Sequence, residues 1–223
     1  MKRLVPLLAL TLTITACAAG PRGPRIAPRA NPSAVIAAEL AFAKLAQDKG
    51  QWTAFRETST GEAVMFVPQR VVAHTWLKGR ADPPVAVRWQ PHQVWSSCDG
   101  SYAVTHGAWQ RPNNTVGYFT TIWQRQKDGR HKWVLDHGDA LPFPLDPPEM
   151  IAGKVAECGP KPAFPLKAPP PPPPGWLPGQ AADNTLVWNT IVEPDGARRV
   201  VVSLWNGKAY DVVLDEAVAA EAK

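Results

Sequence analysis

Residues 128–139, DGRHKWVLDHGD, join a tight-turn pair to the start of a long strand. Asp128-Gly129 is among the strongest short signals for a β-hairpin. The apolar residues that follow it alternate with polar ones, as in a strand with one buried face. Similar breaks precede it at Asp99-Gly100 and at Asn113-Asn114. From Val85 onward the sequence therefore predicts a meander of four long antiparallel strands.

A helix is predicted upstream of these strands. Asn31-Pro32 is a typical helix start, and residues 33–50, SAVIAAELAFAKLAQDKG, follow it and end at Gly50, a typical stop. The predicted apolar stripe consists of Val35, Ile36, Leu40, Phe42 and Leu45. A second short helix through Trp52 and Phe55, a strand ended by Pro68 and a third helix around Trp76 complete this part. Helices followed by an antiparallel meander indicate an α+β fold.

This order, with AELAFAKLAQDKGQWTAF at its start and DGRHKWVLDHGD at its end, resembles the nuclear transport factor 2-like superfamily. Within it, SnoaL-like and ketosteroid-isomerase-like proteins are most similar, and the resemblance covers residues 33–141. It implies a cone-shaped curved antiparallel sheet packed on N-terminal helices, a cystatin-like fold that encloses a pocket. Some members are isomerases, dehydratases or hydrolases, and many only bind ligands.

The amino terminus is typical of a bacterial lipoprotein. Residues 1–16 contain a basic start and a short apolar stretch that predict a signal peptide. Ile14-Thr15-Ala16-Cys17 resembles a lipobox, which implies lipidation of Cys17; an ordinary secretory signal is the alternative. Because Ala18 replaces the Asp that commonly retains lipoproteins at the inner membrane, we expect an outer-membrane lipoprotein that faces the periplasm. Residues 17–32 predict a flexible tether.

The remaining chain divides at its prolines. Residues 142–180 hold 14 of the 25 prolines and predict a linker with a polyproline II run. Residues 181–223 predict a small C-terminal β-meander of three strands, with turns at Pro194-Asp195-Gly196 and Asn206-Gly207. The predicted fold class is thus an α+β cone domain over residues 33–141, followed by this linker and meander.

The cysteines and charges narrow the class of protein. With Cys17 lipidated, Cys98 and Cys158 remain and predict a disulfide in an oxidising compartment, with two free thiols as the alternative. The net charge of +5 comes from the basic residues of 1–32, so the rest of the chain is neutral. A neutral folded part excludes the basic surface that binds nucleic acid. The spacing of the cysteines fits no zinc site, and we expect no metal and no cofactor.

Turn geometry predicts which side chains share a sheet face. If each hairpin has a two-residue turn, Trp109 lies opposite Tyr118, and Thr120 lies opposite His137. Seven residues on that face are the predicted pocket wall: Gln90, His92, Trp109, Tyr118, Thr120, His137 and Asp139. His106, Thr121, Trp123 and Asp136 then belong to the other face. A bulge on any strand would change this assignment, and a structural role for the histidines is the alternative.

Three functions fit these observations. We expect an envelope lipoprotein whose cone binds a small apolar or amphipathic ligand without catalysis, with a homodimer through the sheet as a further expectation. The first alternative is an isomerase- or dehydratase-type enzyme with an Asp139 or His137 base and a Tyr118 donor. The second is a structural envelope protein. Catalytic residues stay unassigned, because the first helix lacks the tyrosine that ketosteroid isomerases present from it.

Overall fold

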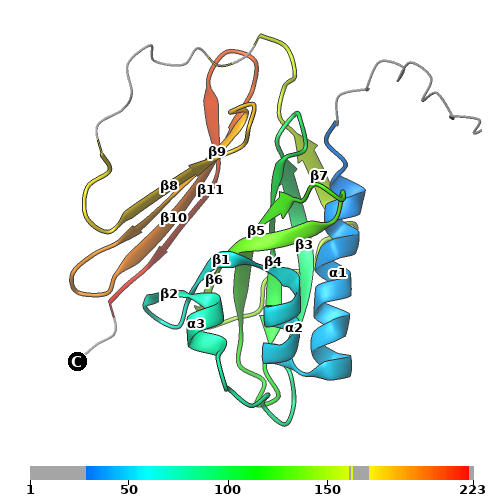
Figure 1. Ribbon diagram of the computed structural model, residues 1–223, viewed down its shortest axis with the longest axis vertical. Coiled ribbons are helices and arrows are strands. Elements are labelled where there is room, and N and C mark those ends of the chain that lie inside the picture. Colours follow the sequence, from blue (N-terminus) through cyan, green and yellow to red (C-terminus); the bar gives the residue numbers. More distant parts are fainter. Residues whose placement is uncertain (1–28, 161, 163–170, 221–223) are drawn as a thin grey trace, which may run out of the picture.

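Two β-sheets and three helices make up this protein in a computed structural model that describes residues 29–160, 162 and 171–220 (Figure 1). The helices are α1 (Pro32–Lys49), α2 (Gln51–Thr58) and α3 (Ala73–Leu77). The first sheet contains β1 (Ser59–Phe66), β2 (Arg70–Val72), β3 (Arg88–Ser96), β4 (Tyr102–Gln110), β5 (Val116–Arg125), β6 (His131–Leu141) and β7 (Ala152–Val155). The second contains β8 (Trp176–Gln180), β9 (Leu186–Val192), β10 (Arg198–Trp205) and β11 (Tyr210–Val218).

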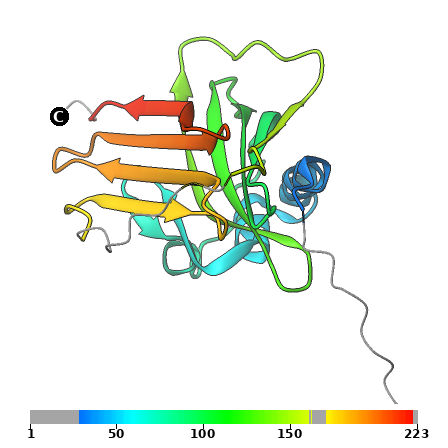
Figure 2. The ribbon, with the colours of Figure 1, turned by 90° about the horizontal axis from the view of Figure 1, so that it is seen from above.

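These elements form three layers. The first sheet has the order β2-β1-β6-β5-β4-β3-β7, antiparallel except for the parallel pairs β1–β6 and β3–β7. The helices lie against one of its faces, and the second sheet, in the order β11-β10-β9-β8, lies against the other (Figure 2). The predicted fold class is confirmed: a curved sheet on N-terminal helices, followed by a small C-terminal meander.

Helix α1 begins and ends as the sequence predicts, but its buried face is rotated. The side chain of Asn31 accepts a hydrogen bond from the N–H of Ala34, which caps the first turn. The buried stripe is Val35, Glu39, Phe42 and Ala46, a 4-3-4 spacing. Leu40, predicted to be buried, is 43% exposed. A glutamate therefore takes a place in the core that an apolar residue was expected to fill.

Turn lengths account for the largest difference between the predicted and observed sheets. Arg111 pairs with Thr115 around a three-residue loop in which Asn114 adopts a φ of 65°, so the turn after β4 is one residue longer than predicted. Trp109 consequently lies opposite Gly117, and the predicted pairing of Trp109 with Tyr118 is wrong. The predicted pairings of Tyr118 with Asp139 and of Thr120 with His137 are confirmed.

A bulge changes β3 in the same way. The register between β3 and β4 shifts between Pro91 and Gln93, which leaves His92 as the extra residue. Trp89 rather than Gln90 therefore lies opposite Trp109. Pro91 has no N–H to donate to a neighbouring strand, and such residues are common at bulges.

The stretch predicted to be a linker contains two strands. β7 pairs with the outer edge of β3, and β8 pairs with β9, so the second sheet has four strands rather than three. Leu186, Val200, Val202, Leu204 and Leu214 of this sheet pack on Trp95, Val104, Ile122 and Leu135 of the first. The second sheet thus shares a hydrophobic core with the cone.

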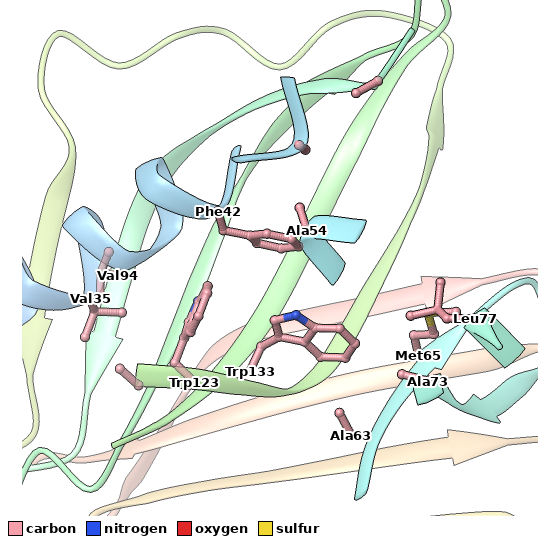
Figure 3. Close-up of a cluster of buried hydrophobic side chains, with 13 residues drawn as sticks. Val35, Phe42, Ala54, Ala63, Met65, Ala73, Leu77, Val94, Trp123 and Trp133 are labelled. Atoms are coloured by element: carbon pink, nitrogen blue, oxygen red, sulfur yellow. The ribbon is translucent and has the colours of Figure 1, made fainter. Parts of the chain in front are cut away.

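A separate core lies between the helices and the first sheet (Figure 3). Its largest members are Phe42, Trp123 and Trp133, each at most 1% exposed. No described helix is both long enough and apolar enough to cross a membrane. Residues 1–16 and Cys17, on which the lipoprotein prediction rests, lie outside the described residues.

The predicted disulfide is confirmed. Cys98, in the turn after β3, is bonded to Cys158, which follows β7, and their Cα atoms are 5.2 Å apart. The bond holds the segment after β7 against the end of the cone, next to the parallel pair that β7 makes with β3.

We predict that replacing Cys98 and Cys158 together with Ala lowers the free energy of unfolding by about 4 kcal/mol or somewhat less. The bond closes a loop between residues 60 apart, and closing such a loop restricts the unfolded chain by this order of magnitude. Urea denaturation of the double variant measures the loss. Reduced wild-type protein is the control and should unfold at the same midpoint, whereas a variant as stable as oxidised wild type would contradict the prediction.

Candidate functional site

A cavity of about 490 Å³ opens on the helix side of the cone. Seven aromatic side chains line it: Phe42, Trp52, Phe55, Phe66, Trp89, Trp109 and Phe119. The rings of Phe42 and Trp89 meet edge to face with centroids 4.8 Å apart, and Phe42 meets Phe55 similarly at 4.9 Å. This size and this apolar lining are typical of sites for small organic molecules.

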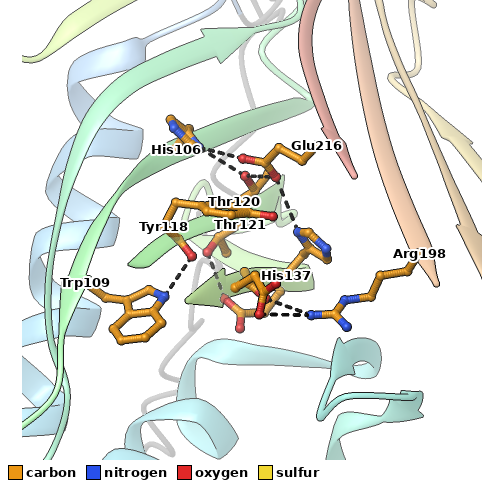
Figure 4. Close-up of polar contacts among 11 residues, drawn as sticks. His106, Trp109, Tyr118, Thr120, Thr121, His137, Arg198 and Glu216 are labelled. Atoms are coloured by element: carbon orange, nitrogen blue, oxygen red, sulfur yellow. Dashed lines mark hydrogen bonds and ion pairs between the residues drawn. The ribbon is translucent and has the colours of Figure 1, made fainter. Parts of the chain in front are cut away.

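Trp109 is fixed as part of the cavity wall. Its ring occupies the space that a side chain at Gly117 would need, so only glycine fits opposite it. Its indole N–H donates to the backbone oxygen of Tyr118 over 2.8 Å (Figure 4). The guanidinium of Arg111 lies over the ring, 4.8 Å from the centroid. The wall therefore presents a rigid aromatic surface next to a positive charge.

Asp136 on β6 brings a carboxyl group into this aromatic cavity. Protein atoms surround the carboxyl group, although the residue as a whole is only half-buried. Burial raises the pKa of Asp136 to about 7, and the nearby carboxylate of Glu39 adds to the rise, although a 3.0 Å hydrogen bond from the hydroxyl of Thr121 opposes it. Near neutral pH this group can therefore either donate or accept a hydrogen bond.

A second buried carboxyl group fixes the walls rather than facing the ligand space. Glu39 of α1 accepts hydrogen bonds from the indole N–H of Trp89 at 2.7 Å, from the indole N–H of Trp123 at 3.0 Å and from the hydroxyl of Thr105 at 2.5 Å. It is fully buried, and burial raises its pKa despite these bonds. These bonds tie the helix to three adjacent strands and set the position of Trp89 in the cavity wall.

The predicted pocket wall is wrong for four of its seven residues. Gln90, His92, Tyr118 and Thr120 do not line the cavity, whereas Trp109, His137 and Asp139 border it. Although His137 borders the cavity, its side chain is completely buried on the other face, where it meets Glu216 of the second sheet. The extra residue in the turn after β4 and the bulge at His92 are the physical reasons, because each shifts one strand by one position. A Tyr118 donor inside the cavity, as the enzyme alternative required, is likewise contradicted.

Tyr118, Thr120 and His137 instead form a polar cluster with Glu216 of β11, between the two sheets (Figure 4). The Nδ1 atoms of His106 and His137 lie 3.0 and 3.3 Å from the two carboxylate oxygens of Glu216. Burial acts to raise the pKa of Glu216, but the two neighbouring histidines outweigh it and hold that pKa below its ordinary value. The cluster fastens the C-terminal strand to the cone.

The described part of the chain contains no candidate metal site. No three His, Cys, Asp or Glu side chains there are placed to hold a metal ion. The two histidines lie within 3.3 Å of Glu216, and Thr120 forms hydrogen bonds with His106 and Glu216 across the two sheets.

The observed fold agrees with the predicted resemblance. The order of helices and strands and the curved sheet described above are those that the resemblance to the nuclear transport factor 2-like superfamily implies. No protein-family model and no curated protein matches the chain.

Several solved structures are similar to about half of the chain. A protein assigned as a ketosteroid isomerase, from Parabacteroides distasonis, is 18% identical with a TM-score of 0.39 and covers 52% of this chain and 98% of its own. A protein assigned as an aromatic ring hydroxylase, from Novosphingobium aromaticivorans, is 14% identical with a TM-score of 0.38, and the match covers 51% of this chain and 91% of that protein. A protein of unknown function with a cystatin-like fold, from Methylobium petroleophilum, is 10% identical with a TM-score of 0.37, and the match covers 56% of this chain and 86% of that protein.

Sequence reasoning missed three residues of the site. The predicted faces place Asp136 away from the pocket, because the longer turn after β4 shifts β5 and β6 by one position relative to β4. Glu39 is absent from the predicted buried stripe of the first helix, although it falls within the 35-39-42-46 spacing of such a stripe. Arg198 lies in the C-terminal meander, 58 or more positions from every other wall residue of the cavity, and no local pattern connects it to them.

We predict that Asp136→Asn flattens the pH dependence of stability between about pH 4 and pH 7. In this range the unfolded chain has released the Asp136 proton, whereas the folded protein retains it, so wild-type stability falls as pH rises, by up to about 1.4 kcal/mol per pH unit. Glu39, whose pKa is also raised, acts in the same direction. Glu216, whose pKa is lowered, acts in the opposite direction and below its ordinary value of 4.5.

Denaturant unfolding at several pH values measures this dependence. Asp128→Asn is the matched control, because Asp128 lies on the surface in a turn and its loss should leave the slope between pH 4 and pH 7 unchanged. An Asp136→Asn variant with the wild-type slope would contradict the assignment.

Proposed function

We propose that the cone binds a small amphipathic molecule with an apolar, ring-bearing body and does not transform it. The observation that carries this proposal is the cavity itself, about 490 Å³ in volume and lined by seven aromatic side chains with Asp136 among them. Aromatic side chains supply large apolar area and pack edge to face or offset on other rings. One carboxyl group with a pKa near 7 would then orient a polar group of the ligand.

An enzyme of the isomerase or dehydratase type is the second candidate, and Asp136 is the observation that favours it. A carboxyl group with a pKa of about 7 is suited to accept and return a proton near neutral pH. Such a reaction also needs a donor to stabilise negative charge on the substrate. Among the wall residues, the hydroxyl of Thr121 donates to Asp136 itself, whereas the guanidinium groups of Arg111 and Arg198 could supply such a donor. Binding needs only the apolar walls and one polar anchor, so it is proposed ahead of catalysis.

The cellular setting belongs to the same proposal. We propose an envelope lipoprotein, anchored through Cys17 to the outer membrane and facing the periplasm, on the strength of Ile14-Thr15-Ala16-Cys17. The disulfide between Cys98 and Cys158 supports an oxidising compartment. A structural envelope role stays the alternative. A homodimer through the first sheet stays a hypothesis and would have to use surface that the second sheet leaves uncovered.

We predict that Trp109→Ala weakens binding of a neutral aromatic probe, 2-naphthamide, about tenfold or more, because it removes a fixed ring from the wall. A tenfold loss corresponds to about 1.4 kcal/mol, within the range for one aromatic contact. Quenching of tryptophan fluorescence measures the affinity. Trp176→Ala is the matched control, since Trp176 is 42% exposed on β8 and lines no part of the cavity.

The same titrations separate the two candidate functions. If the probe fails to bind, or if both tryptophan variants bind it as wild type does, the proposed site is wrong. Native mass spectrometry of the purified protein identifies a co-purified ligand, which should be recovered chemically unchanged after incubation. Conversion of that ligand by wild type but not by Asp136→Asn would establish the enzyme instead.

We predict that Cys17→Ser abolishes lipid attachment, because the thiol that would be acylated is removed. Labelling cells with radioactive palmitate and recovering the protein measures the modification. Replacing Cys98 with Ser is the control and should leave labelling intact. Palmitate on the Cys17→Ser protein would contradict the lipoprotein proposal.

A further inference from the structure

One wall residue of the cavity comes from outside the cone. All the other lining residues belong to positions 42–140, whereas Arg198 is the first residue of β10 in the second sheet. It lies on the inner face of that sheet, in the same row as Val200, Val202 and Leu204. The C-terminal sheet therefore contributes a guanidinium group to a site that is otherwise built by the cone (Figure 4).

The guanidinium of Arg198 is buried, and its hydrogen bonds are incomplete. Its side chain is 7% exposed, and one nitrogen, Nη2, donates to the backbone oxygen of Gly138 over 3.1 Å. Its Nε–H is buried and has no partner among the described residues. A guanidinium has five N–H donors, and a buried donor without an acceptor costs free energy. Native structures seldom retain such a group without a reason.

The nearest carboxylate compensates this charge only weakly. Asp139 lies 3.8 Å from Nη2, beyond hydrogen-bonding distance, and its side chain is 43% exposed, so water screens its charge. The ring of Phe66 is 5.9 Å from the guanidinium carbon and adds an apolar wall beside it. The partly satisfied cation thus adjoins a volume lined by aromatic rings.

We infer that the ligand of this cavity is an amphipathic acid, whose carboxylate binds Arg198 while its ring-bearing body packs among the aromatic side chains. This inference rests on the proposed function and names the class of ligand. A carboxylate accepts two parallel N–H bonds from one guanidinium and would neutralise the charge that Asp139 compensates only weakly. The second sheet then has a direct role in recognition.

Two probes of the same shape test the inference on the wild-type protein. The probe 2-naphthoate carries a carboxylate, and 2-naphthamide replaces it with a neutral amide. Isothermal titration at pH 6, where the naphthoate is ionised and Asp136 mostly keeps its proton, should give an affinity for the naphthoate at least about tenfold higher. Equal affinities would overturn the inference and leave the proposed function intact, whereas failure of both probes to bind would contradict the proposed function itself.

Variants then locate the source of the preference. Arg198→Gln should bind the two probes equally, and Arg198→Lys should retain only part of the preference because it lacks the planar fork. Arg199→Gln is the matched control: Arg199 is the next residue, on the opposite face, where it pairs with Asp215, and its loss should change neither affinity. If Arg111→Gln removes the preference and Arg198→Gln does not, the inference is overturned.

Discussion

The arrangement of the cone depends on the hydrogen bonds that the buried carboxyl group of Glu39 accepts. A single side chain of α1 accepts bonds from Trp89 on β3, Thr105 on β4 and Trp123 on β5, so it fixes the helix across three strands at once. Burying a carboxyl group is costly unless its oxygens are bonded, and here three donors approach two oxygens. Because two of those donors are tryptophans, the same bonds set the orientation of large rings in the core and in the wall of the cavity.

The second sheet extends the cone in two ways. Its apolar inner face covers the outer face of the first sheet, which would otherwise expose Trp95, Val104, Ile122 and Leu135. Two of its polar residues lie at one end of that contact: Glu216 between two histidines and Arg198 at the cavity. Hydrophobic contact holds the layers together, and the buried charges determine how they are aligned, since a shift of one residue would leave both charges without partners.

Turn lengths explain how far the sequence could predict this fold. The elements and their order follow from periodicity, caps and turn residues, and the disulfide follows from the cysteine count. Pairing between β5 and β6 is right for a fortuitous reason: the turn at Asp128-Gly129 has one residue more than assumed, and the bulge opposite Ile122 and Trp123 restores the register. The turn after β4 is also one residue longer, but no bulge compensates for it, so Trp109 was paired wrongly.

The candidate site was less predictable, because it depends on side-chain direction and on contacts far apart in the chain. A one-residue shift moves every side chain of a strand to the other face, which placed Asp136 outside the pocket and Tyr118 inside it. Composition could not indicate that β10 of the meander supplies Arg198 to the cavity. Nor could the alternation of polar and apolar residues on β11 specify that Glu216 meets Thr120, since the two are 96 positions apart.

The way in which the last strand closes over the cone bears on the order of folding. Contacts between residues 87 and 96 positions apart join the second sheet to the first. In addition, β7 pairs in parallel with β3, at the opposite side of the first sheet from β6, the strand that precedes it in the chain. Folds rich in such distant contacts form slowly, because the chain loses the entropy of closing long loops before the contacts stabilise it. The helices and first six strands are made well before β11, so a nascent cone has an apolar outer face and no layer to cover it. Completion of the native structure therefore awaits the synthesis of β11.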